Sequence, residues 1–125
     1  MGKKHSPLFL QRVEHSRSII KECDIDEFSS MLNDHDSLFV IDVRETYEYE
    51  SGHMEHALHI SKGVLERDIE KHPIGTSDRI VLYCGGGFRS AIAAQSLKEM
   101  GYEDVYSLWG GWRAILDTDI KKSSL

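Results

Sequence analysis

The sequence predicts an α/β fold: a central, mostly parallel five-stranded sheet flanked by helices. The runs LFVIDV (38–43) and RIVLY (79–83) are short, rich in β-branched residues and bounded by polar or turn residues, as buried parallel strands are. Segments with helical periodicity lie between the strand-like runs. This alternation of strand and helix favours a parallel sheet with right-handed crossovers.

The remaining elements complete this pattern along the chain. Shorter runs indicate three further strands, and the helix over 90–100 is closed by Gly101 at its C′ position. A closing helix follows Gly111, and residues 7–17 predict an N-terminal helix outside the sheet. The further strands are expected at 18–22, 57–60 and 104–108, and the other helices at 25–33, 45–51, 62–71 and 112–120.

The chain length predicts a single domain. At 125 residues and 14.3 kDa, it is long enough to bury a core without disulfide or metal staples. We expect residues 1–17 to form a helical extension, 18–120 the α/β domain, and 121–125 a C-terminal tail.

Charge and composition narrow the classes of partner. The net charge of −6, with 21 acidic and 15 basic residues, argues against nucleic acid or an anionic membrane as partner. No run approaches the roughly 20 apolar residues that span a bilayer. The start resembles no secretory signal, and two cysteines far apart form no disulfide framework. We therefore expect a cytoplasmic location, with small molecules or proteins as partners.

The stretch YCGGGFRS (83–90) carries the candidate chemistry. Ligands of α/β sheets bind beyond the carboxyl ends of the strands, and Cys84 stands where RIVLY ends and the next helix begins. Unpaired N–H groups at a helix N-terminus stabilise an anion, which favours the nucleophilic thiolate. Three glycines would let the backbone curl around the sulfur with its N–H groups inward. Arg89 would supply a planar donor fork or cap the loop carbonyls.

Three motifs in order resemble the rhodanese-like sulfurtransferase family. CGGGFRS (84–90) is similar to that family's active-site loop. IDVRETYEYESGHMEHALHI (41–60) and MGYEDVYSLWGGW (100–112) are similar to its second and closing blocks. The resemblance covers roughly residues 18–117, and it implies a rhodanese-like fold for the domain over 18–120.

The resemblance implies covalent catalysis through Cys84 without a metal or cofactor. Cys84 would take a sulfane sulfur from thiosulfate or a persulfide donor, hold it as a persulfide, and pass it to cyanide or a thiol, including a protein thiol. The inward N–H groups of the loop would stabilise the outer sulfur. The expected substrate-binding residues of this loop are Gly85, Gly86, Gly87, Phe88, Arg89 and Ser90.

Two other functions remain open. The chain could be a non-enzymatic module of this family that carries sulfur or docks a partner. Related cysteine-dependent phosphatases and arsenate reductases have five residues between cysteine and arginine. Only four separate Cys84 from Arg89, which favours sulfur over phosphate. No basic side chain follows the cysteine directly, so we expect weak binding of thiosulfate.

Asp42 lies near the end of the predicted strand LFVIDV and Arg44 follows it, so both would lie near the mouth of the site. Arg44 would lend positive potential to an incoming anion and Asp42 would orient the loop, or the two would pair with each other, which we favour. His53, His56 and His59 do not converge unless they share one helix, so we predict no metal site.

The roles of three other residues stay open. Cys23 is a structural cysteine at a strand end or a resolving thiol. Phe88 anchors the loop in the core or forms an exposed apolar rim, and Trp109 fills the core or walls one side of the pocket.

Overall fold

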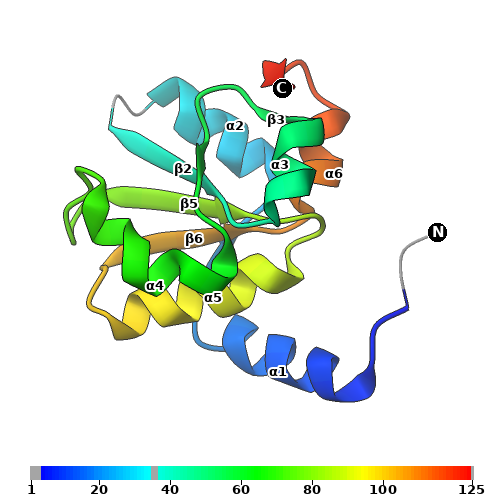
Figure 1. Cartoon of the computed structure of the whole chain (residues 1–125), viewed down its shortest axis with the longest axis vertical. Helices are drawn as coiled ribbons and strands as arrows, with labels where there is room; N and C mark the ends of the chain where they lie inside the picture. Colours follow the sequence, from blue (N-terminus) through cyan, green and yellow to red (C-terminus); the bar gives the residue numbers. More distant parts are fainter. Residues whose placement is uncertain (1–3, 35–36, 125) are drawn as a thin grey trace.

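The computed structural model describes residues 4–34 and 37–124 (Figure 1). Residues 1–3 of the expected extension and residue 125 of the expected tail lie outside the described residues. A five-stranded, all-parallel sheet forms the centre, with strand order β1-β6-β5-β2-β4. The predicted fold class is confirmed. The strands are β1 (Lys21–Cys23), β2 (Leu38–Asp42), β4 (Leu58–His59), β5 (Arg79–Tyr83) and β6 (Asp104–Leu108).

The sheet is covered on both faces. Ile41, Ile80 and Leu82 face one hydrophobic cluster, whereas Val40 and Val81 face the other. Because side chains alternate along a strand, strands covered on both faces are apolar throughout, as the sequence indicated. The first cluster includes side chains of α4 (Leu65–Asp68) and α5 (Phe88–Glu99), and the second includes side chains of α2 (Ile25–Asp34) and α6 (Gly111–Leu116).

Some boundaries differ from the predicted ones. β1 begins at Lys21 because the turn after α1 (Pro7–Arg17) continues, with the Ile19 and Ile20 N–H groups donating to the Ser16 carbonyl. The closing helix ends at Leu116, where the Thr118 hydroxyl donates to a carbonyl of the last turn at 2.7 Å. α3 spans Thr46–Ser51, and the predicted helix over 62–71 comprises α4 flanked by 3₁₀ turns over Lys62–Val64 and Ile69–Lys71.

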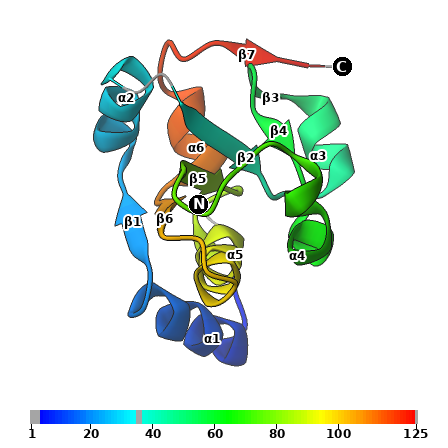
Figure 2. The ribbon, with the colours of Figure 1, turned by 90° about the vertical axis from the view of Figure 1, so that its left-hand side faces the viewer.

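The N-terminal helix α1 packs on α5, away from the sheet (Figures 1 and 2). Val13 is 1% exposed, and Ser16 is fully buried. The Ser16 hydroxyl donates to Gln95 Oε1 at 2.7 Å, and Arg12 donates to the same oxygen at 2.9 Å. A buried polar contact of this kind fixes the helix in one position, because its donors lose water and must keep their partner.

The expected C-terminal tail contributes a strand. β7 (Lys122–Ser123) pairs antiparallel with β3 (His53–Met54), and the Glu55 N–H donates to the Lys121 carbonyl at 2.9 Å. No helix in the described ranges, 4–34 and 37–124, has the length and apolar character needed to cross a membrane.

Candidate active site

Cys84 lies at the carboxyl end of β5, and its side chain meets the start of α5. The sulfur accepts hydrogen bonds from the backbone N–H groups of Gly87 at 3.1 Å and Ser90 at 3.4 Å. The thiol lies 3.5 Å from Ser90 Oγ, which is itself 2.8 Å from Ser107 Oγ. The N-terminal end of a twelve-residue helix therefore points at the sulfur, a setting that favours negative charge there.

The loop carbonyls point outward, toward the start of α6. The Trp112 N–H donates to the Cys84 carbonyl at 2.7 Å, the Arg113 N–H to the Gly85 carbonyl at 3.2 Å, and the Gly110 N–H to the Gly86 carbonyl at 3.0 Å. Orienting the carbonyls this way turns the N–H groups of the loop toward the sulfur. Within residues 4–34 and 37–124, the N–H groups of Gly85 and Gly86 have no hydrogen-bond acceptor.

Close packing of the loop on α6 depends on Gly111. This residue has φ +52°, and a Cβ there would collide with the Cys84 carbonyl oxygen. The sequence predicted the loop after β5 as the site of the chemistry, but the support from Gly111 was not predicted. The glycine pair in WGGW was the available signal, because paired glycines often mark a close backbone approach.

The three loop glycines are not equivalent. Gly87 has φ +110°, and a Cβ there would lie 3.0 Å from the Trp109 ring. Gly85 and Gly86 are outside the left-handed region, and a Cβ on Gly86 would meet nothing closer than 3.9 Å. Among the three loop glycines, only Gly87 therefore requires the freedom to adopt a positive φ.

Arg89 is held by a carboxylate from another element. Its guanidinium donates to Glu48 of α3 at 2.7 and 3.2 Å, so the expected fork is occupied by a side chain and does not cap the loop carbonyls. The Arg89 hydrogen bond holds the pKa of Glu48 below its usual value. Both groups keep about a quarter to a third of their side chain exposed, with 34% for Arg89 and 23% for Glu48.

Asp42 and Arg44 form a buried pair. Asp42 is fully buried and accepts three side-chain hydrogen bonds from Arg44, the shortest at 2.7 Å, while the Arg44 guanidinium also donates to the Gly52 carbonyl. The guanidinium lies 4.9 Å from the centre of the Trp112 ring. Asp42 and Arg44 therefore pair with each other, and the Asp42 carboxylate largely compensates the Arg44 charge.

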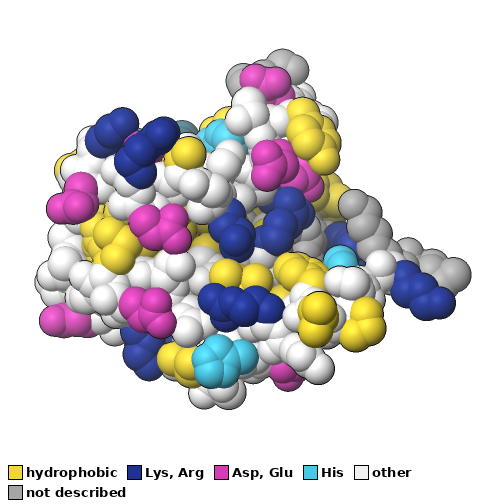
Figure 3. Space-filling view, turned by 60° about the horizontal axis from the view of Figure 1, so that its bottom comes forward, with side chains coloured by type: hydrophobic (Ala, Val, Ile, Leu, Met, Phe, Trp, Pro, Cys, Tyr) yellow, Lys and Arg dark blue, Asp and Glu magenta, His cyan; other side chains and the backbone are white. Residues whose placement is uncertain are grey.

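A cavity of about 960 Å³ opens over Cys84. It brings together five predicted residues besides the cysteine, whereas Gly87, Ser90 and Asp42 do not line it. Figure 3, which brings the lower part of Figure 1 forward, shows basic and hydrophobic side chains close together on that face. The predicted residues that line the cavity with Cys84 are Gly85, Gly86, Phe88, Arg89 and Arg44.

Several lining residues, among them His5, Phe9 and Arg113, were not predicted from the sequence. His5 lies in the segment before α1 and Phe9 lies in α1, whereas Trp112 and Arg113 come from α6. No local pattern marks these positions, because their contact with the loop arises from packing between distant elements. Trp109 lines the cavity and is 38% exposed, so it serves as a wall of the pocket.

The other candidates lie apart from this chemistry. His53 and His59 stack on Tyr49, and His53 Nδ1 lies 2.8 Å from the Tyr49 carbonyl, as expected for a structural histidine. Cys23 is 1% exposed, and burial raises the pKa of its thiol to about 12. It is therefore a poor nucleophile.

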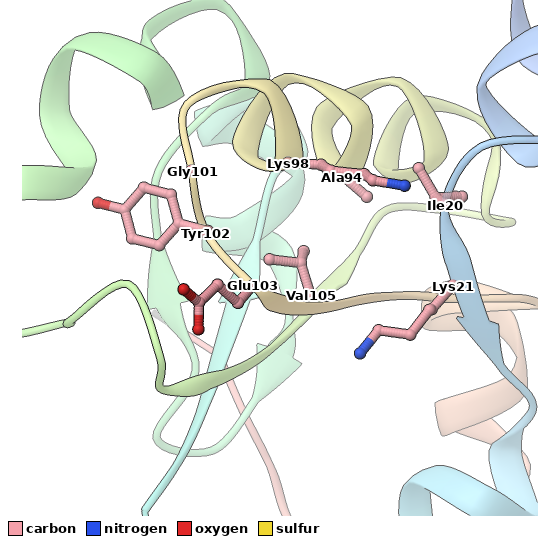
Figure 4. Close-up of a pocket in the computed structure, with 8 residues that line it drawn as sticks. All are labelled: Ile20, Lys21, Ala94, Lys98, Gly101, Tyr102, Glu103 and Val105. Carbon is pink, nitrogen blue, oxygen red and sulfur yellow. The ribbon is translucent and has the colours of Figure 1, made fainter.

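A second hollow of about 500 Å³ lies near the C-terminal end of α5 (Figure 4). Its two lysines already have partners: Lys21 pairs with Asp104 at 2.7 Å and Lys98 donates to the Ile19 carbonyl at 2.8 Å. No cysteine is among the described residues that line this hollow.

A parallel sheet with a cysteine cradled by backbone N–H groups at a strand end defines a cysteine-centred α/β protein. The family model for the rhodanese-like domain matches residues 24–118. The chain belongs to the rhodanese-like domain family, which confirms the resemblance seen in the sequence.

Two curated relatives differ in their described roles. The putative sulfur carrier protein YrkF of Bacillus subtilis is 33% identical over 103 residues, which cover 80% of this chain and 55% of that protein. The tRNA uridine(34) hydroxylase of Escherichia coli is 39% identical over 89 residues, or 68% of this chain and 25% of that protein. The chain thus spans about half or less of these relatives.

Solved structures confirm the fold. The polysulfide-sulfur transferase homodimer from Wolinella succinogenes has a TM-score of 0.80 and 22% identity, covering 94% of this chain and 88% of that one. The protein RPA3614 from Rhodopseudomonas palustris, described as a possible tyrosine phosphatase, has a TM-score of 0.76 and 22% identity, covering 97% and 99%.

Proposed function

We propose that this protein is a sulfurtransferase that moves a sulfane sulfur from thiosulfate or a persulfide to cyanide or a thiol through a persulfide on Cys84. The carrying observation is the hydrogen-bonding of the sulfur by the Gly87 and Ser90 N–H groups at the start of α5. The thiolate is the attacking form, and these donors stabilise it without a metal.

The first step forms one bond and breaks one. The Cys84 thiolate attacks the sulfane sulfur of the donor, the donor's S–S bond breaks, and the remainder leaves with the electron pair, as sulfite does from thiosulfate. The added sulfur then lies in the cavity, where the free N–H groups of Gly85 and Gly86 are the nearest candidates to stabilise its negative charge.

Intact-mass spectrometry after exposure to thiosulfate tests this step. We expect a gain of one sulfur atom that is absent in Cys84→Ser, and formation of thiocyanate when cyanide is added. Cys23 serves as the internal control, because it remains in the variant and is buried. An unchanged mass with thiosulfate and with a low-molecular-weight persulfide donor would refute the proposal.

A sulfur carrier is the second candidate, favoured by the described role of YrkF. A carrier would acquire the persulfide yet release no thiocyanate at a steady rate, so the two assays separate it from an enzyme. Hydrolysis of an aryl phosphate that disappears in Cys84→Ser would instead indicate a phosphatase, which the four-residue spacing to Arg89 disfavours.

The proposed chemistry requires the Cys84 thiol to be reduced, which favours a cytoplasmic location.

A further inference from the structure

The N-terminal helix contributes an aromatic wall to the cavity over Cys84. The Phe88 ring lies 4.8 Å from the His5 ring, 6.4 Å from the Phe9 ring and 5.6 Å from the Trp109 ring, measured between centroids. All four side chains line the cavity. Three segments far apart in sequence therefore build one apolar surface beside the nucleophile.

Two of these residues lie outside the part of the chain that matches the family. The match begins at residue 24, whereas His5 and Phe9 precede it. The buried contact between Ser16 and Gln95 holds α1 on α5, so the wall is a fixed part of the fold. His5 and Phe9 thus bring to the wall two rings from outside the part of the chain that matches the family model.

Arg113 provides a cation on the same cavity. A Cβ placed on Gly86 would lie 3.9 Å from its guanidinium carbon, so the charge stands beside the catalytic loop. Arg44 and Arg89 are compensated by carboxylates, but Arg113 forms no ion pair with any residue in 4–34 or 37–124. It is the arginine of this cavity that is left to bind an external anion.

The cavity is large for the smallest sulfur acceptors. Its volume of about 960 Å³ falls at the upper end of small-molecule sites, where ligands of drug-like size bind. Cyanide would occupy only a small part of it.

We propose that His5, Phe9, Phe88 and Trp109, together with Arg113, form an acceptor subsite for a low-molecular-weight thiol that carries a planar apolar body and an anionic group. The apolar body would pack on the aromatic wall, and the anion would pair with the guanidinium. This inference rests on the proposed persulfide chemistry of Cys84.

The transfer step is balanced without a further reactant. The acceptor thiolate attacks the outer sulfur of the Cys84 persulfide, the S–S bond between that sulfur and Cys84 Sγ breaks, and Cys84 leaves as a thiolate. The product is the acceptor's persulfide. The transferred sulfur keeps its oxidation level, so the step needs no oxidant or reductant.

Three acceptors test the wall and the cation separately: 4-mercaptobenzoate, benzenethiol and cyanide. The preformed Cys84 persulfide is mixed with each, and the second-order rate constant for sulfur loss is measured by mass. Phe9→Ala is expected to slow both aromatic thiols about fivefold and leave cyanide unchanged, because a ring contact is worth roughly 0.5–1.5 kcal/mol. Leu8→Ala, on the exposed side of α1, is the matched control.

Arg113→Gln is expected to slow 4-mercaptobenzoate about tenfold while changing benzenethiol and cyanide by less than twofold, since a charge-assisted contact contributes about 1.5 kcal/mol. Arg67→Gln, an exposed arginine remote from the cavity, is the matched control. Equal effects of either cavity variant on all three acceptors would overturn the subsite, because only a general disturbance acts on cyanide.

The readout separates this inference from the proposed function. If the persulfide forms and reacts with cyanide, but Phe9→Ala and Arg113→Gln leave the rate constants for the aromatic thiols unchanged, the subsite is refuted and sulfur transfer stands. If no persulfide forms on Cys84, the proposed function itself fails before any acceptor is tested.

Discussion

Gly111→Ala tests how the loop around Cys84 is held against α6. Gly111 has φ +52°, where a residue with a Cβ costs about 1–2 kcal/mol. The new Cβ would also collide with the Cys84 carbonyl and lie 2.9 Å from Gly85 backbone atoms. Relieving such overlap typically costs about 1–3 kcal/mol. We expect a total loss of about 3 kcal/mol in the free energy of unfolding.

This loss converts into a measurable shift in melting temperature. With an unfolding entropy of about 2.1 cal/mol/K per residue, a chain of 125 residues loses roughly 4 °C for each kcal/mol. Gly111→Ala should therefore lower Tm by roughly 10 °C in a calorimetric scan. It should also slow persulfide formation, because the 2.7 Å hydrogen bond from the Trp112 N–H to the Cys84 carbonyl must lengthen.

Gly63→Ala is the matched control. It lies in an exposed 3₁₀ turn with negative φ, and a Cβ there would meet no atom within 4 Å. We expect its Tm to stay the same or rise slightly, since alanine restricts the unfolded chain. A Gly111→Ala variant that melts within about 2 °C of the wild type would refute the argument that α6 and the loop require this close approach.

Three further outcomes are expected. Asp42→Asn leaves a buried guanidinium unpaired and should cost about 3–5 kcal/mol in urea unfolding. Glu48→Gln should cost about 1 kcal/mol in the free energy of unfolding at pH 7. Because Arg89 lowers the pKa of Glu48, the stability difference between variant and wild type should vanish as the pH falls through that lowered pKa. A stability difference that stays constant with pH would contradict the pairing of Glu48 with Arg89. Iodoacetamide should modify Cys84 at least tenfold faster than Cys23, as seen by peptide mass; equal rates would count against the cradle.

The placement of the loop around Cys84 could be predicted because its signals are local. A buried strand, a cysteine at its end and a helix start all fall within residues 79–90, so periodicity and spacing place the thiol at the helix N-terminus. The five-stranded sheet could be predicted for the same reason. Strands buried on both faces are apolar along their length, and that pattern is visible without any long-range contact.

Which residues contact the loop around Cys84 was decided by the tertiary structure. Glu48 reaches Arg89 across 41 positions, and the glycines of WGGW position α6 under the loop, but no sequence pattern states these pairings. The same holds for Phe9 and Arg113, which face Cys84 only because α1 packs on α5 and α6 lies beneath the loop.

The sequence by itself thus determined the fold class, the position of Cys84 at a strand end and the direction of the helix that follows it. These properties follow from the alternation of apolar residues and the spacing of motifs within about a dozen residues. Backbone geometry alone then sets where each of these side chains lies. Tertiary structure alone decided which charges are compensated and what walls the cavity has. Those properties arise when side chains from distant segments pack together, and packing depends on the three-dimensional fit of all the elements at once.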